Sequence, residues 1–485
     1  MKRIIAIVLM LSLLSVSSFF MIGGIVNKEK SNVTIKENVI YGDKSYADGI
    51  SVLITSQCNY HLFWNTSFTI GDQNTTTTDY KFCYDEQYKI GGMPYSGLGL
   101  DTDFKYGIDT STPAEESTGL QKAYRELYDE LEPGEEGKKT IYLQDYYTYY
   151  PVRISVNLPG VIWNGNSYEH LIYKNYENER AVWDTFNEFF KIPIPEDLPA
   201  FEISVSRHLK DSGAATGAFG IDRNFYFNVK STYTDNRIFF SIGNKYDQKN
   251  GEDVKYVDTS LIPGGYGLYS FTFKNVRNST NTNGNTTTFY PGYETGVEAD
   301  TLEMVFPLEQ HVEVIFLTLS NDESKLYMFT KEYNSTYLTV IDIATMSELQ
   351  KFKITDAKNF TFYEYENCIV LNGWEYISVI EKKEDGLCSL AFTVSRMKEV
   401  NDSNYQKGVA TTMAFDGEKL VIIDRTGDEM YPSLELCGFT VAVYNNTGLV
   451  YYGEYESSLS ISESANEYEY NDRCRPTEYT VSFTK

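Results

Sequence analysis

The stretch SNDESKLYMFTKEYNSTYLTVIDIATMSELQKFKI, residues 320–354, decides the fold. A polar turn around Asp322 leads into the apolar run Leu326–Phe329, and a second run rich in β-branched residues follows at 335–342. Short runs of this kind, separated by turn residues, are typical of antiparallel strands. The stretch therefore predicts hairpins of an antiparallel sheet.

The same pattern returns at residues 414–455, as AFDGEKLVIID and, after an insert, GFTVAVYNNTGLVYYGEY. Asp322 and Asp416 hold the same position in a turn, three residues before Lys325 and Lys419. Each of these lysines begins an apolar run. The matching order of turn and strand indicates an internal repeat.

A similar unit lies between the two copies, FTFYEYENCIVLNGWEYISVIEKKEDGLCSLAFTVSR at residues 360–396, with Asn367 in the place of the lysine. The three equivalent positions are separated by 42 and 52 residues. A four-stranded blade of a β-propeller takes roughly 40–50 residues. The repeat length is therefore close to that of propeller blades.

The repeated region, residues 312–456, resembles secreted β-propellers whose blades carry a D-x-x-K-L turn and then a V-I-D-x-A-T strand. The second element stands at residues 340–345 as VIDIAT, and its final AT is lost in the other two units. More loosely, the whole chain resembles uncharacterised membrane-anchored, β-propeller-like extracytoplasmic proteins of low-GC Gram-positive bacteria. This resemblance implies a blade-built body and no particular reaction.

Most of the remaining chain alternates as short strands between turn residues, beginning with residues 51–70. Two segments have helical spacing instead, and we expect both to be insertions: residues 113–131 and residues 176–190. Three polar or glycine-rich tracts are expected to be loops: residues 74–78, 90–103 and 278–288.

Together these patterns predict an all-β protein, a β-propeller of seven or eight blades with two helical insertions and an N-terminal transmembrane helix. The final strand, TEYTVSFTK at residues 477–485, would close the ring on the first blade and remove two unpaired edges. The alternative is two packed all-β domains. The expected organisation is an anchor at 1–30, a linker at 31–50 and a propeller-like domain at 51–485, with a sub-boundary near 278–300.

The N-terminal residues 4–26, IIAIVLMLSLLSVSSFFMIGGIV, are uncharged and mostly apolar. About 20 such residues suffice for a helix to cross the hydrocarbon core of a bilayer. Lys2 and Arg3 precede the run, so the positive-inside bias favours a single-pass cell-membrane protein with its bulk extracytoplasmic. The alternative is secretion after signal-peptide cleavage near residues 16–18.

The cysteines all fall in the part expected to be exported, and their even number permits up to three disulfides. Buried free thiols are the other interpretation, because a free cysteine packs as a small hydrophobe. No pair has C-x-x-C spacing, which argues against zinc and thiol-redox motifs. The six are Cys58, Cys83, Cys368, Cys388, Cys437 and Cys474.

The 485-residue chain carries a formal net charge of −26, which repels phosphates and excludes nucleic acid as a partner. With 68 acidic residues, no carboxylate pair stands out for glycoside hydrolysis. Neither an H-E-x-x-H nor a G-x-S-x-G motif occurs. The four histidines are isolated along the chain: His61, His170, His208 and His311.

Three weaker patterns each have a structural interpretation that we favour. Asp101, Asp103 and Asp109 resemble part of a calcium loop, but Thr112 stands where an EF-hand needs glutamate. Five tyrosines within residues 142–150 could stack sugar rings, although cross-strand packing suits them better. PGGYGLY at residues 263–269 is expected to form a tight turn before a strand.

The sequence thus assigns no catalytic, cofactor-binding or metal-ligating residue, and it leans against an enzyme. We expect a membrane-anchored extracytoplasmic binding module that recognises a protein or a cell-envelope glycan. The alternative function is an envelope polysaccharide hydrolase or lyase.

Overall fold

The structure is a computed structural model of the 485-residue chain, and it forms two compact units. Unit 1 comprises Met1–Ile90 and Asn359–Lys485, and unit 2 comprises Gly91–Lys358. The described residues are 2–58, 62–82, 97–102, 104, 116–157, 176–196, 200–209, 214–219, 225–246, 254–278, 281–283, 286–288, 292–356, 360–373, 375–396, 412–426, 438–458 and 475–484.

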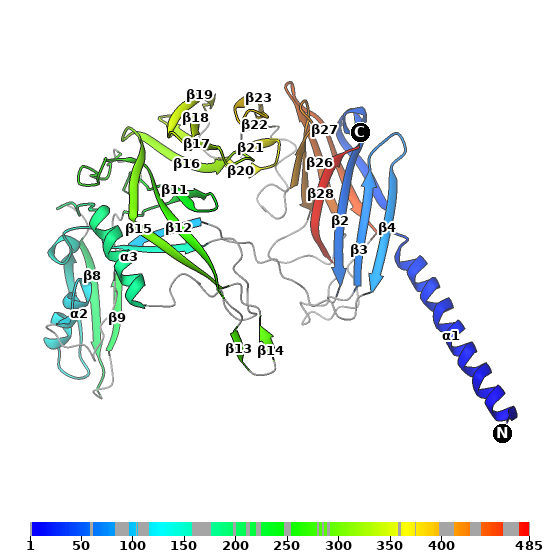
Figure 1. The fold of residues 1–485 in the computed structure, drawn as a ribbon, viewed down its shortest axis with the longest axis horizontal. Coiled ribbons are helices and arrows are strands. Elements are labelled where there is room, and N and C mark those ends of the chain that lie inside the picture. The colour runs from blue at the N-terminus through cyan, green and yellow to red at the C-terminus, as the bar shows by residue number, and fades with distance from the viewer. Residues whose placement is uncertain are drawn as a thin grey trace. The chain divides into compact units, whose positions relative to one another are not determined.

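Unit 1 is built from three antiparallel sheets, which we call sheets I, II and III (Figure 1). Sheet I has the order β28-β2-β3-β4, with β28 Arg475–Phe483, β2 Ile50–Cys58, β3 Leu62–Thr69 and β4 Thr75–Phe82. Sheet II has the order β1-β27-β26-β25-β24, with β1 Ile35–Gly42, β27 Gly448–Ser457, β26 Gly438–Asn445, β25 Leu420–Thr426 and β24 Thr412–Phe415. Sheet III runs consecutively through β20 Phe360–Glu364, β21 Cys368–Gly373, β22 Tyr376–Lys382 and β23 Cys388–Ser395.

The two ends of the chain pair with each other inside unit 1. In sheet I the last strand, β28, runs antiparallel to β2, with Ile50 opposite Phe483. In sheet II, β1 adds a fifth strand to the edge of β27, with Ile35 opposite Ser457. The pairing of residues 477–485 with the first strand of the body is therefore confirmed.

Apolar side chains fill the space between these sheets in two clusters. One joins sheets I and II and is centred on Phe68, Phe439 and Tyr455, where the Phe439 and Tyr455 rings stack 5.0 Å apart. The other joins sheets II and III and includes Val379, Phe392 and Ile422. Because neighbouring sheets share one apolar layer, unit 1 is a stack of small sheets.

Helix α1, Lys2–Lys30, opens the chain, so the apolar run at residues 4–26 is helical. The indole N–H of Trp64 in β3 donates to the carbonyl of Lys30 at 3.0 Å. The transmembrane helix expected at residues 4–26 finds no support in the structure: among the residues it describes, no helix is both long and apolar enough to cross a membrane.

Unit 2 contains two further four-stranded antiparallel sheets and three smaller ones. Sheet IV runs through β16 Val312–Leu319, β17 Lys325–Glu332, β18 Ser335–Asp342 and β19 Ser347–Thr355, and sheet V through β10 Lys230–Tyr233, β11 Arg237–Ser241, β12 Gly267–Asn278 and β15 Gly292–Pro307. The smaller sheets are β6-β8-β9 (Glu136–Tyr142, Ala200–Arg207, Ala214–Phe219), β5-β7 (Gly97–Thr102, Val152–Asn157) and β13-β14 (Asn281–Asn283, Thr286–Thr288).

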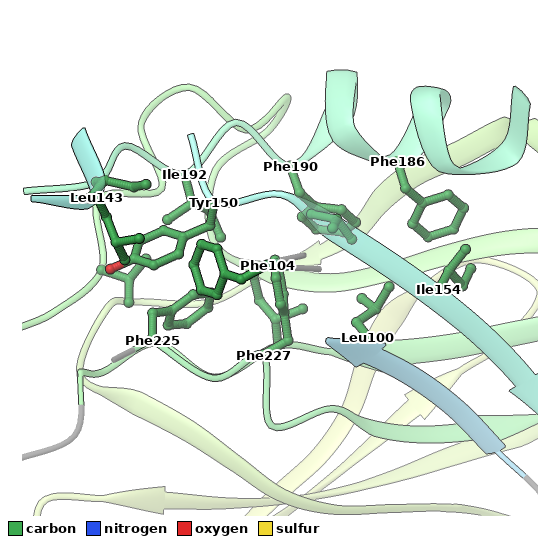
Figure 2. Packing of buried hydrophobic residues seen from close by; sticks show 14 of the residues in the cluster. Leu100, Phe104, Leu143, Tyr150, Ile154, Phe186, Phe190, Ile192, Phe225 and Phe227 are labelled. Carbon is green, nitrogen blue, oxygen red and sulfur yellow. The ribbon is translucent and has the colours of Figure 1, made fainter. Parts of the chain in front are cut away.

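Two helices of unit 2 cover a large aromatic core: α2, Leu120–Asp129, and α3, Tyr176–Phe189. Both lie within the segments expected to be helical. Figure 2 shows Phe186 and Phe190 pointing from the helix toward Leu100 and Ile154 of the β5-β7 ribbon. The helical insertions are therefore part of a hydrophobic core.

The repeat detected in residues 312–456 corresponds to sheets IV, III and II, each containing a four-stranded antiparallel meander. Asp322 accepts a hydrogen bond from the backbone N–H of Ser324, and Asp416 accepts one from that of Lys419. Both aspartates thus close the turn before the second strand of their meander. The repeat prediction is confirmed, and so is the all-β class.

All three tracts expected to be loops contain strands. Residues 75–78 belong to β4, where threonines pair across to β3, as Thr66 does with Thr78. The threonine tract forms a strand because β-branched side chains fit a pleated surface. Within residues 278–288, β13 pairs with β14. Residues 97–102 likewise form β5, a strand inside the glycine-rich tract.

Cys368 and Cys388 are buried and form no disulfide, as the packing interpretation expects. They lie on β21 and β23, the two neighbours of β22, opposite Glu381 and Lys382 respectively. Strands two apart are roughly 9–10 Å from each other, too far for a disulfide. Cys83, Cys437 and Cys474 lie outside the described residues, and the side chain of Cys58 is not described.

Candidate functional site

The candidate site lies in unit 2, where sheets IV and V meet at the ends of their strands. Residues 308–311 connect β15 of sheet V directly to β16 of sheet IV. The buried Asn244, in the connection from β11 to β12, donates to the carbonyls of Gln310 and Val312 at 2.7 and 3.0 Å. Gln310 in turn donates to the carbonyl of Val257 at 2.9 Å. These bonds hold three connecting segments together.

Two antiparallel β-bridges pair these segments and place alternate side chains in a row on the side that faces away from the core. Phe225 pairs with Tyr246, and Lys245 pairs with Tyr256. Phe225 and Tyr246 are buried in the core, so the adjacent residues Tyr226 and Lys245 point to the opposite side. Tyr226 and Tyr256 are 55% and 40% exposed. Lys245 therefore lies between two exposed tyrosine rings.

The row continues onto sheet IV through an ion pair. Lys245 Nζ lies 2.5 Å from Glu313 Oε2, and both side chains are about one-third exposed or less. Glu313 is the second residue of β16, and His311 lies in the turn immediately before that strand. The imidazole of His311 lies 3.2 Å from Glu309 Oε2 through Nδ1.

Tyr333 completes the row by stacking on His311, with ring centroids 4.7 Å apart and an interplanar angle of 23°. It is 76% exposed, in the two-residue turn between Glu332 and Ser335. Its φ of 55° is a conformation that this turn position normally gives to glycine. A bulky residue held there costs about 1–2 kcal/mol. Glu323 and Met346, in other turns of sheet IV, have similar φ values of 55° and 52°, so what distinguishes Tyr333 is its exposed ring.

We call this set the aromatic strip: Tyr226, Lys245, Tyr256, His311, Glu313 and Tyr333. The strip offers stacking faces, hydroxyl groups and charges already matched in pairs. Among the residues that the structure describes, no cluster of histidine, cysteine or carboxylate is arranged to hold a metal.

A second polar cluster, the Glu37 cluster, lies in unit 1 and is largely buried. Glu37 Oε2 accepts from Lys44 Nζ at 2.6 Å and from Asn74 Nδ2 at 2.8 Å, and Oε1 lies 3.0 Å from each hydroxyl of Tyr451 and Tyr455. The two hydroxyl oxygens lie 2.6 Å apart.

Burial raises the pKa of Glu37, but the four hydrogen bonds outweigh it and bring the pKa below 4.5. Burial also raises the pKa of Tyr451 and of Tyr455, so both hydroxyls keep their protons. Both tyrosine side chains are closed to solvent. The Glu37 cluster therefore joins β1 to β27 and offers no surface to a substrate.

Three of the five tyrosines at 142–150, Tyr146, Tyr147 and Tyr150, pack in the core, but they do so from the segment after β6 rather than across strands. Tyr150 is buried against Phe225, with ring centroids 5.5 Å apart. The hydroxyl of Tyr147 accepts from the backbone N–H of Leu120 at 3.0 Å. Burial and Glu126 raise the pKa of Tyr146 to about 12.

The other sequence candidates have equally simple outcomes. The turn at residues 263–269 is confirmed: Gly264 and Gly265 have φ of 81° and 82°, and β12 follows. Asp101 lies at the end of β5, while Asp103, Asp109 and Thr112 are outside the described residues, as are His61 and His170. His208 is exposed. His311, which looked isolated in sequence, has an aromatic partner and a carboxylate.

Sequence reasoning missed the strip because its members are spread over more than 100 positions, from Tyr226 to Tyr333. One local signal was available. Tyr333-Asn334 joins two strand-like runs, where a two-residue hairpin turn favours glycine or asparagine in the first position. A tyrosine there is unusual enough to mark the position.

Comparisons with known proteins give no assignment. No protein-family description and no curated protein matches the sequence. Two similar solved structures are a provisionally assigned 6-phosphogluconolactonase from Bacteroides uniformis (11% identity, TM-score 0.22, 54% of this chain and 78% of that chain) and a functionally unknown protein from Desulfotomaculum acetoxidans (11%, 0.21, 54% and 94%). Likenesses with TM-scores this low carry no argument about fold or function.

Proposed function

We propose that this protein is a membrane-anchored extracytoplasmic binding module, built as a β-propeller, that takes its ligand on the aromatic strip. The observation that carries the binding role is the strained, 76% exposed Tyr333 stacked on His311. A ring held in this way is pre-organised for contact, which lowers the entropy cost of binding.

The repeated meanders support the propeller. Sheets II, III and IV each contain four strands in consecutive order, and sheet I combines three early strands with the last strand of the chain. Completing the first sheet with the last strand is how a ring of blades avoids free edges. A propeller with helical insertions accounts for both features.

The N-terminal sequence supports the location. Residues 4–26 carry no charge, and the two residues before them are basic. The large apolar side chains described in the second half of α1, among them Phe20, Ile22 and Val26, are exposed. Insertion into a bilayer would remove that apolar area from water. Cleavage near residues 16–18, giving a secreted protein, is the alternative.

A polysaccharide hydrolase or lyase is the weaker candidate. Hydrolysis needs two carboxylates beside a sugar-sized cleft, one of them free to move a proton. The strip and its margin offer Glu309 and Glu313, but Glu313 is held by Lys245 at 2.5 Å. An ion-paired carboxylate of this kind favours binding over acid–base catalysis.

The test is surface crosslinking on intact cells, followed by capture of the tagged full-length protein. Wild type is compared with Tyr333→Ala, with a tagged 1–50 anchor and with Tyr142→Ala, which removes a tyrosine 46% exposed outside the strip. We expect one enriched envelope component with wild type and Tyr142→Ala, and its loss with Tyr333→Ala. Equal recovery from wild type and the 1–50 anchor would refute the binding role.

A further inference from the structure

We infer that the aromatic strip recognises a neutral glycan chain, with Tyr226, Tyr256 and Tyr333 each stacking against the C–H face of a sugar ring. The inference rests on the proposed binding function and names its ligand class. It follows from three properties of the strip: the free faces of its rings, the pairing of its charges, and the placement of charge between the rings.

The rings combine an apolar face with a polar tip. Tyr226, Tyr256 and Tyr333 are 55%, 40% and 76% exposed, and their hydroxyls bond no residue in the part of the chain that the structure describes. A sugar ring presents aliphatic C–H groups on its faces and hydroxyls around its rim. An exposed tyrosine matches both, by stacking and by hydrogen bonding.

The charge pairs of the strip disfavour an anionic ligand, although Lys331 lies opposite Glu313 on the neighbouring strand. Lys245 is neutralised by Glu313 at 2.5 Å, and His311 faces Glu309 at 3.2 Å. Next to Tyr333 in the chain, Glu332 Oε1 lies 2.6 Å from Lys351 Nζ. A phosphate or sulfate would have to break one of these pairs and approach a chain of net charge −26. A neutral ligand faces neither cost.

The order of residues favours a glycan over a protein partner. The core of a protein interface is depleted in charge and continuous in apolar area. Here Lys245 and Glu313 stand between the tyrosine rings, although Val254 and Leu261 nearby are exposed. Charged groups beside stacking rings suit hydroxyl-rich ligands, because ammonium donors and carboxylate acceptors can both bond hydroxyls.

The strip extends over three neighbouring segments and the turn of sheet IV, so it presents more than one stacking position. Chains of several sugars should therefore bind more tightly than single sugars of the same kind. Loss of one ring should weaken a chain about threefold to tenfold, the range expected for one aromatic stacking contact. Loss of two rings should multiply these factors.

The experiment is calorimetric titration of the detergent-solubilised full-length chain with neutral hexasaccharides, chitohexaose and cellohexaose, and with anionic oligogalacturonate. The variants are Tyr333→Ala, Tyr226→Ala and the double change, with Tyr142→Ala as the matched control. We expect a neutral hexasaccharide to bind more tightly than its monosaccharide, each strip variant to weaken it, and the control to bind as wild type.

Three results would overturn the inference: preference for the anionic chain, no binding of any neutral chain, or equal weakening by Tyr142→Ala. Failure here is separable from failure of the binding role. If the cell-surface experiment captures a protein that depends on Tyr333 while no glycan binds, only the ligand class falls. If neither experiment shows dependence on Tyr333, both proposals fall.

Discussion

The Glu37 cluster of unit 1 and the aromatic strip of unit 2 are made from nearly the same residue types: tyrosines, one lysine and a glutamate. In the Glu37 cluster the hydroxyls are buried and all converge on a single carboxylate. In the strip the rings face solvent, and the lysine and glutamate satisfy each other. Burial therefore distinguishes the structural Glu37 cluster from the exposed strip that we propose as a binding surface, and each prediction that follows tests one side of this contrast.

The largest effect is expected from Glu37→Ala. The change leaves the Lys44 ammonium and the hydroxyls of Tyr451 and Tyr455 without their acceptor. We expect the free energy of unfolding to fall by about 2–4 kcal/mol, measured by urea denaturation. The control is Glu202→Ala, which removes an exposed partner of Lys138 and should cost less than about 1 kcal/mol. Equal losses would contradict the structural role of the cluster.

The second effect is a pH dependence carried by Glu37. Its pKa is below 4.5 in the folded chain, so the folded state binds a proton less readily than the unfolded state. Its contribution to stability is present above the ordinary pKa of an unfolded glutamate and is lost as pH falls through the lower folded pKa. Comparing wild type with Glu37→Gln, we expect a stability gap at neutral pH that narrows in acid. A constant gap would show that ionisation of Glu37 contributes nothing.

The third effect concerns the backbone of Tyr333. Glycine adopts a φ of 55° without strain, whereas alanine does not. We expect Tyr333→Gly to raise the free energy of unfolding by up to about 1 kcal/mol over Tyr333→Ala. Both variants remove the ring, so both should lose ligand. Thermal unfolding of the pair measures the strain, and equal stabilities would show that the turn stores none.

The smallest effect is the coupling between Lys245 and Glu313. Their ion pair is partly exposed, and such pairs contribute about 0.2–1 kcal/mol. A double-mutant cycle with Lys245→Gln and Glu313→Gln measures this coupling, and a second cycle with Lys44→Gln and Glu37→Gln measures its counterpart. The second coupling should be larger. The reverse order would break the contrast between the two clusters.

Local pattern predicts much of this fold. The repeat in residues 312–456 predicts meanders because turn and strand recur together, and α2 and α3 are predicted from helical spacing. The threonine tract at 75–78 is polar, which favours a loop. Its β-branched side chains instead form a strand that pairs with β3. The spacing of apolar residues along a segment predicts whether it forms a helix or a strand, but not which other segment it packs against.

The two clusters escape prediction for that reason. Glu37 meets Tyr451 and Tyr455 only because β1 pairs with β27, more than 400 residues away. Tyr226 and Tyr333 share a surface only because Asn244 ties the connections of two sheets together. Of the tyrosines at 142–150, which are more conspicuous candidates for stacking sugars, Tyr146, Tyr147 and Tyr150 pack in the core, whereas Tyr142 is exposed.

The pairing of the two chain ends has a consequence for biogenesis. Thr34 and Ser458, which hydrogen-bond each other, are 424 residues apart, and β2 finds β28 only in the final residues. Unit 2 is one uninterrupted stretch and can fold while synthesis continues, but the early strands of unit 1 must wait with open edges. A chain that ends prematurely would leave β2 without β28. Without β28, the open edge of β2 would be exposed to aggregation or proteolysis.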